Sequence, residues 1–196
     1  MWCRLRLQTT KIVFLTGICL FVLLSPLRAE IARLEICASY FNPSEKAFRD
    51  IYGQGVKYGF DIGRSVWKNL EFYVSLTYYY KRGKLTYTQE ATRVILRPIG
   101  VHLRYVFLKK KINLYAGGGL TYNLFEERNP IGKVKEDKFG FVVRTGGYTR
   151  IKGLKKFMKE FIMDVYISYN HCHMRPAEIG FNIGGLDLGM ALGFAF

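Results

Sequence analysis

The closing segment of the chain, residues 186–196, alternates strictly between two kinds of side chain. Bulky apolar residues fill every even position from Leu186 to Phe196, and aspartate, glycine or alanine fills every odd one. Side chains on a β-strand point alternately to opposite faces. This segment therefore predicts a strand with one large apolar face and one small, partly polar face.

Seven earlier segments show the same period of two and are separated by turn signals. They cover residues 33–40, 56–63, 70–79, 99–107, 112–122, 139–144 and 161–170. A helical period of 3.6 residues is not sustained anywhere in this part of the sequence. We therefore predict an all-β protein with eight antiparallel strands joined up and down.

The two faces of these strands differ in composition as a whole. One face is continuously large and aromatic, and the other mixes glycine, serine, threonine and asparagine with charges of both signs. A soluble barrel would turn the bulky apolar face inward. Its outer face would then need solvating lysine and glutamate at most positions, but in this chain that face would be rich in glycine. Eight strands enclose an interior that side chains can fill, so small and charged residues belong inside and bulky ones in lipid. The sequence predicts an eight-stranded antiparallel up-and-down transmembrane β-barrel.

Charged side chains in the inward phase form the main candidate site. We interpret them as a salt-bridge and hydrogen-bond network that fills the lumen, because buried charges need partners. The abundant inward glycine keeps a second hypothesis open, a narrow solute channel. The predicted network residues are Arg33, Glu35, Lys57, Asp61, Glu71, His102, Arg104, Arg144, Asp164 and Asp187.

The start of the chain has the features of an export signal. Basic residues precede an apolar run from Ile12 to Leu24, and a small residue, Ala29, follows it. The run is shorter than the roughly 20 residues that a membrane-spanning helix needs. We predict a cleavable signal peptide over 1–29 and a single barrel domain over 30–196.

The chain is strongly basic, with a formal net charge of +15 at pH 7. For an exported protein, anionic lipid is a better explanation of this charge than nucleic acid. We expect Arg93 and Arg97 to contact lipopolysaccharide phosphates. Strict alternation from Ile99 would turn Arg97 towards lipid. A β-bulge at Ile95–Pro98 would repair this misfit, and Pro98 lacks the N–H donor that a regular ladder needs.

Short and long connections alternate between the predicted strands. Three are short (65–69, 108–111 and 152–159), and four are long and polar (42–53, 81–93, 125–138 and 171–182). Transmembrane barrels place short turns in the periplasm and long loops outside, so both termini should be periplasmic. The partner of the four long loops is not specified by the sequence.

Other chemistry is weakly supported. His171-Cys-His173 offers metal-ligating side chains but lacks ligands from a second element, so we expect a solvated loop and no metal. A Cys37–Cys172 disulfide is not expected from their places on the strands. Some outer-membrane barrels modify lipid with a Ser-His pair, but Ser75 and Ser168 phase inward. We therefore expect neither an enzyme nor a cofactor.

The chain beyond the predicted signal peptide resembles the outer-membrane β-barrel domain superfamily of opacity-type and small OmpA-like barrels. The resemblance lies in Val56–Gly63, Pro98–Phe107, Leu114–Tyr122 and the terminal Phe196. It implies insertion by the barrel-assembly machinery, and roles in envelope integrity, adhesion or passage of small solutes. The assembly signal would be Leu188, Leu192, Phe194 and Phe196. We predict a structural or interactive role for a monomer in the outer membrane.

Overall fold

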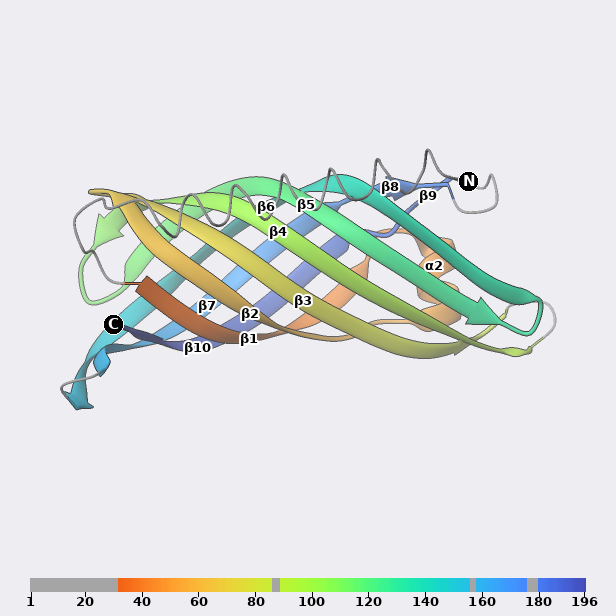
Figure 1. Ribbon diagram of the computed structural model, residues 1–196, viewed down its shortest axis with the longest axis horizontal. Helices are drawn as coiled ribbons and strands as arrows, with labels where there is room; N and C mark the ends of the chain where they lie inside the picture. The colour runs from red at the N-terminus through yellow and green to blue at the C-terminus, as the bar shows by residue number, and fades with distance from the viewer. Residues whose placement is uncertain (1–31, 86–88, 156–157, 176–179) are drawn as a thin grey trace, which may run out of the picture. The chain divides into compact units, whose positions relative to one another are not determined.

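Eight strands close into one antiparallel barrel in the computed structural model (Figure 1), which describes residues 32–85, 89–155, 158–175 and 180–196. The predicted signal peptide, Met1–Ala29, lies outside the described residues. Consecutive strands pair with one another around the ring, and the first pairs with the last. The barrel strands are β1 (Ala32–Pro43), β2 (Gly55–Trp67), β3 (Leu70–Lys84), β4 (Ala91–Lys109), β5 (Asn113–Asn129), β6 (Gly132–Lys155), β7 (Met158–His171) and β10 (Gly185–Ala195).

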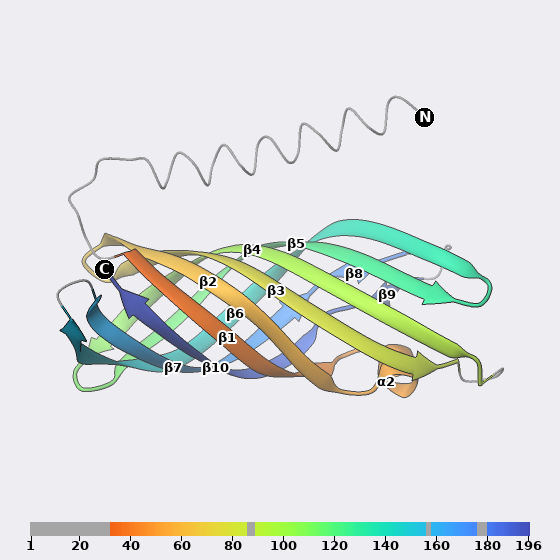
Figure 2. The same cartoon turned by 60° about the horizontal axis from the view of Figure 1, so that its bottom comes forward.

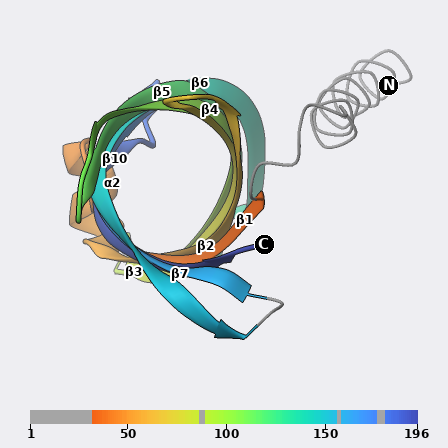
Figure 3. The ribbon, with the colours of Figure 1, turned by 90° about the vertical axis from the view of Figure 1, so that its left-hand side faces the viewer.

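Burial alternates along these strands with the predicted period. In β10 every odd position is buried and every even position from Leu186 to Phe194 is exposed. β1 shows the same alternation, with Arg33 to Phe41 buried at odd positions. The inward and outward phases predicted for the eight strands agree with the structure, so the predicted fold class is confirmed. Figure 3 shows the closed ring viewed along the barrel.

The two ends of the barrel are built differently. Short connections join β2 to β3, β4 to β5 and β6 to β7 at the end where β1 begins and β10 finishes, which we call the turn end. The opposite end, which we call the helix end, carries the short helix α2 (Lys46–Tyr52) and a small hairpin of β8 (His173–Met174) and β9 (Phe181–Asn182). No helix in the described part of the chain is long and apolar enough to cross a membrane.

Two of the four predicted long loops are instead strand over most of their described residues. Pairing of β3 with β4 continues to Lys84 and Ala91, and pairing of β5 with β6 continues to Asn129 and Gly132. The predictions of loops over 81–93 and 125–138 are therefore wrong. These predictions were drawn from polar composition, and exposed charged side chains are solvated on a strand as well as in a loop. These hairpins project beyond the rest of the barrel at the helix end (Figure 2).

The bulge that would have repaired the misfit of Arg97 is not formed at Ile95–Pro98. β4 keeps one register with β5 through Arg97 and Pro98, and its register with β3 is the same on both sides of this point. The pairing of β4 with β3 is interrupted between the Leu76–Ile99 and Tyr79–Leu96 pairs. Proline lacks an N–H to donate, so the sheet loses pairing there without inserting a residue. Arg97 consequently stays on the exposed outer face.

Candidate functional site in the barrel interior

An ionic layer fills the interior nearest the turn end, with Arg104 of β4 at its centre. Its Nη2 lies 3.2 Å from Glu35 Oε1 of β1, and its Nη1 lies 3.1 Å from Asp164 Oδ2 of β7. Its Nε lies 3.3 Å from Glu71 Oε2 of β3. All four side chains are almost completely buried. One guanidinium thus joins four strands across the lumen.

A second arginine and two tyrosines extend this ionic layer. Arg33 Nη2 lies 2.6 Å from Glu71 Oε1, which also accepts a 2.9 Å hydrogen bond from the Tyr148 hydroxyl. The Tyr115 hydroxyl donates to Asp164 Oδ2 at 2.8 Å. Charge-assisted hydrogen bonds of this kind are stronger than neutral ones. The layer therefore forms one connected network of buried charges and phenols.

Tyrosine rings lie over some of the inward glycines. A Cβ placed at Gly63 would lie 2.3 Å from the Tyr73 ring, and one at Gly189 would lie 2.4 Å from the Tyr166 ring. The same tyrosines support arginines, with the Arg104 guanidinium 3.4 Å from the centre of the Tyr73 ring. The inward glycines therefore make room for aromatic rings and do not leave an open bore at these positions.

A polar layer occupies the middle of the barrel. Arg144 Nη1 lies 2.6 Å from Asp61 Oδ2, and Lys57 Nζ lies 3.1 Å from Asp187 Oδ2. A cavity of about 60 Å³ lies beside these pairs. This space is large enough to hold a few water molecules.

His102 also lines this cavity and is 5% exposed. Its ring stacks on Tyr73 at a centroid distance of 5.6 Å. Neither ring nitrogen has a hydrogen-bond partner among the residues that the structure describes. The structure thus separates His102 from the ion pairs, although sequence phasing placed it in the same network.

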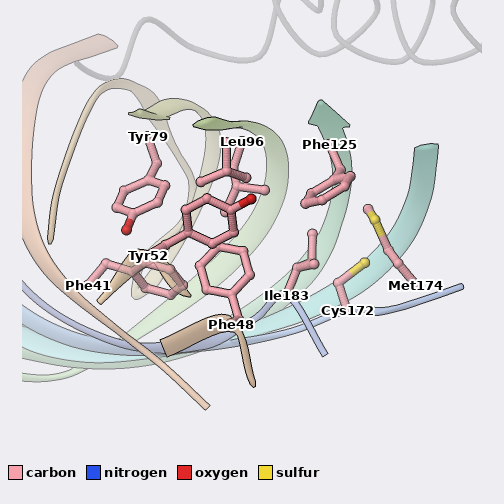
Figure 4. Packing of buried hydrophobic residues seen from close by; sticks show 10 residues of the cluster. Phe41, Phe48, Tyr52, Tyr79, Leu96, Phe125, Cys172, Met174 and Ile183 are labelled. Atoms are coloured by element: carbon pink, nitrogen blue, oxygen red, sulfur yellow. The ribbon is translucent and has the colours of Figure 1, made fainter. Parts of the chain in front are cut away.

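An apolar layer closes the interior at the helix end (Figure 4). Phe48 and Tyr52 point from α2 into the middle of this cluster. Lys57 Nζ lies 3.4 Å from the centre of the Phe41 ring and so joins the polar layer to the apolar one. The buried members of the cluster are Phe41, Phe48, Tyr52, Tyr79, Val94, Leu96, Phe125, Cys172, Met174 and Ile183.

Sequence reasoning missed this apolar layer, although a signal for it exists. Val94, Leu96 and Phe125 continue the inward phase of their strands beyond the polar segment, and all three are large and apolar. The expectation of a solvated His171-Cys-His173 loop is wrong at its centre, because Cys172 is buried in the cluster. In the described part of the chain, no group of three or more His, Cys, Asp or Glu side chains could hold a metal ion.

The structure places the ten predicted network residues inside the barrel, where each is buried. The residues of the predicted assembly signal, Leu188, Leu192, Phe194 and Phe196, are exposed on the outside. Arg93 and Arg97 are exposed on the outer side of β4. The alternation in the sequence therefore predicted which side chains point inward and which point outward. The structure adds which of the inward charges pair with one another.

Large apolar side chains cover the outside of the barrel. Leu120 is 65% exposed, Met190 61% and Ile36 63%. Soluble monomers rarely expose contiguous apolar surface on this scale. An outward apolar band around a polar interior is the arrangement found in transmembrane β-barrels.

The comparisons with known proteins identify the fold. No family model matches the sequence, and no curated protein sequence matches it. Neisserial surface protein A is 17% identical and matches with a TM-score of 0.64 over 84% of this chain and 97% of that one. The outer membrane protein OprG of Pseudomonas aeruginosa is 13% identical, with a TM-score of 0.58 over 86% and 96%. Outer membrane protein W of E. coli is 12% identical, with a TM-score of 0.51 over 86% and 98%.

These solved structures are eight-stranded outer-membrane β-barrels. At these identities the likeness concerns the fold alone. The predicted resemblance to small OmpA-like barrels is confirmed at that level. The chain has the fold of the small eight-stranded outer-membrane barrels.

Proposed function

We propose that this protein is a bacterial outer-membrane β-barrel with a closed lumen, which acts as a rigid support for an interaction surface at its helix end. The observation that carries the proposal is the filled interior. An ionic layer centred on Arg104 and an apolar layer around Phe48 lie on either side of a cavity of only about 60 Å³. A plugged barrel supports binding at its ends better than passage through its centre.

Three features support a place in the outer membrane. The barrel has an apolar outer surface, its interior charges are paired, and its fold is that of outer-membrane barrels. Transmembrane barrels of this kind place long connections outside the cell. On our proposal the helix end is extracellular, both termini are periplasmic, and the leader over 1–29 is removed during export. The exposed apolar side of β10, ending in Phe196, would serve as the assembly signal.

The helix end offers the larger and more varied surface. α2 exposes Lys46, Ala47, Arg49 and Asp50, while Phe48 and Tyr52 hold it against the barrel. The hairpin β3–β4 extends beside it, and the hairpin β5–β6 continues this wall of paired backbone on the far side of β4 (Figure 2). Side chains on such a wall are held in fixed positions, which favours recognition of a partner. We assign no catalysis to this surface, and the proposed unit is a monomer.

Conductance in planar bilayers tests the closed lumen. The purified protein should give no steady open events, because the ionic and apolar layers obstruct the lumen. Recovery of folded, heat-modifiable protein from the same bilayers or from matched vesicles shows that it has inserted. Steady single-channel events from inserted protein would overturn the closed-lumen proposal in favour of a narrow solute channel.

Cysteine labelling on intact cells tests the orientation. Ile131 stands at the tip of the β5–β6 hairpin and is 86% exposed, so Ile131→Cys should react with a membrane-impermeant maleimide. Lys110→Cys, between β4 and β5 at the turn end, is the matched control and should react only after the outer membrane is opened. Reversed labelling of the two variants would contradict the proposed orientation.

A further inference from the structure

Four cations form a single row across four neighbouring strands on the outer face of the helix end. Strand register places them directly opposite one another in pairs. The row runs from Arg82 of β3 through Arg93 of β4 and Arg128 of β5 to Lys133 of β6. Like charges directly opposite one another on a sheet are destabilising. This row therefore has an energetic cost that the fold alone does not explain.

The local partners offset only part of this cost. Glu126 Oε1 lies 2.7 Å from Arg128 Nε and 2.8 Å from Lys133 Nζ, and its Oε2 lies 3.7 Å from Lys135 Nζ. One carboxylate thus serves three cations. The Glu126 side chain is 13% exposed, whereas Arg128, Lys133 and Lys135 keep 44%, 37% and 64% of their side-chain surface exposed. The cations remain open to a further anion.

The cationic row lies on the same outer face as the apolar surface of the barrel. Leu76, Ile99, Tyr122 and Phe139 form one cross-strand row of that surface. Arg97 stands two residues from Ile99 on the same face of β4, and Arg93 stands four residues further along. At about 3.3 Å per residue, Arg97 and Arg93 are separated by roughly 13 Å along the strand. Positive charge therefore begins at the edge of the apolar surface and continues away from it.

We propose that this cationic face, Arg82, Arg93, Arg97, Arg128, Lys133 and Lys135, binds the phosphate groups of an anionic lipid headgroup whose acyl chains lie against the neighbouring apolar surface. The proposal extends the expected contacts of Arg93 and Arg97 to a site spanning four strands. It rests on the proposed function in one respect, namely that the helix end lies where membrane lipid meets water.

The chemistry of the site favours phosphate on a lipid over other anions. Guanidinium groups bind phosphate through two parallel hydrogen bonds, and arginine supplies four of the six cations. The spacing of Arg97 and Arg93 suits a headgroup with more than one phosphate, as lipopolysaccharide has. A soluble anion would gain nothing from the adjoining apolar row at Ile99. A lipid would bury its chains there while its phosphates meet the cations.

Binding of bisphosphorylated lipid A to protein extracted from membranes into neutral detergent micelles tests the proposal. A fluorescent derivative of the lipid serves as the probe. The double variant Arg93→Glu and Arg128→Glu should weaken binding at least tenfold. The matched variant Lys110→Glu and Lys111→Glu makes the same charge change at the turn end and should alter binding less than twofold. Heat-modifiable gel mobility shows whether each variant is folded.

Two further measurements show whether the protein binds the phosphates of a lipid or free phosphate. Dephosphorylated lipid A should bind much more weakly than the bisphosphorylated form. Inorganic phosphate at equal phosphate concentration should not displace the lipid. Displacement by inorganic phosphate, equal binding of the dephosphorylated lipid, or unchanged binding by the double variant would each overturn the proposal. None of these outcomes bears on conductance, so the closed-lumen proposal stands or falls separately.

Glu126→Gln gives a test in the opposite direction. Glu126 competes with phosphate for Arg128 and Lys133, so removing its charge should tighten lipid binding severalfold. The conservative variant Arg93→Lys and Arg128→Lys keeps the charge and should bind within a few-fold of the wild type. Weaker binding by folded Glu126→Gln protein would contradict a phosphate site on these cations.

Discussion

The Arg104 guanidinium lies 3.2 Å from the Glu35 carboxylate, although these residues belong to β4 and β1, which are not neighbours in the ring. The ion pair therefore crosses the lumen instead of following one sheet ladder. Arg104 also contacts Glu71 and Asp164. A single side chain thus compensates three buried carboxylates.

Arg104→Ala should lower the free energy of unfolding by about 3–5 kcal/mol, because removing one partner of a buried pair leaves uncompensated charge. The measurement is urea unfolding in phospholipid vesicles, followed by heat-modifiable gel mobility. Arg128→Ala removes the same side chain from an exposed ion pair and is the control, with an expected cost below about 1 kcal/mol. Equal costs for the two variants would show that the ionic layer does not stabilise the barrel.

Gly63→Ala tests the space that glycine gives to Tyr73. The new Cβ would meet the Tyr73 ring at 2.3 Å, and that ring supports Arg104. Overpacking of this kind costs about 1–3 kcal/mol, so the urea midpoint should fall. Gly132→Ala, at a position with nothing within 4 Å, is the control and should leave the midpoint almost unchanged. A midpoint that Gly63→Ala leaves unchanged would mean that Tyr73 can move without loss.

The fold could be predicted because two different environments act on each strand. An apolar outer surface and a packed lumen impose a period of two, so the phases of Leu188 and Asp187 could be recognised from alternation alone. Pairing could not be predicted in the same way. Arg104 reaches Glu35, Glu71 and Asp164 only because of strand register and stagger around the ring, which a single strand does not encode.

The apolar layer was missed for a related reason. Inward positions are polar at Asp61 and His102 but apolar at Leu96 and Phe125. Inward-pointing side chains therefore pack in a polar layer in one part of the barrel and in an apolar layer in another. The change of character follows from α2, which brings Phe48 to this end from a connecting segment. Alternation predicts which face a residue occupies, but it does not predict what another element places against that face.

Leu188→Arg tests whether lipid contacts the outer surface. Leu188 is 56% exposed and lies two residues from the midpoint of β10. Arginine at the bilayer midplane of a transmembrane barrel costs about 2–4 kcal/mol, with smaller costs nearer the interface. Ile131→Arg, at the exposed hairpin tip, is the matched control and should cost almost nothing. Equal tolerance of arginine at both positions, measured by urea unfolding in vesicles, would contradict burial of this surface in lipid.

Phe48→Ser combined with Tyr52→Ser should detach α2 without unfolding the barrel. α2 spans seven residues, and so short a helix is marginal in water unless its side chains are packed. Trypsin should then cut after Arg49 at least tenfold faster in the folded protein. Ala47→Ser, on the exposed side of the same helix, should leave the cleavage rate unchanged. Unaltered cleavage in the double variant would mean that the apolar layer does not hold the helix.

Glu126 should stay ionised to unusually low pH. The hydrogen bond from Lys133 is the largest of the effects that lower the pKa of Glu126, to about 2. Its ionised form therefore stabilises the β5–β6 hairpin above the ordinary glutamate pKa of about 4.3, and this contribution disappears as pH falls towards 2. A carboxyl ¹³C NMR titration should give a midpoint near the lower value.

The matched pair of lysine variants identifies the cause of this shift. Lys133→Ala should move the Glu126 midpoint upwards, because it removes the principal hydrogen bond while Arg128 remains. Lys111→Ala removes the same charge at the turn end and should leave the midpoint where it is in the wild type. An ordinary midpoint near 4 in the wild-type protein would show that Glu126 does not hold the cations of this row together, and their mutual repulsion would then have to be offset by another group.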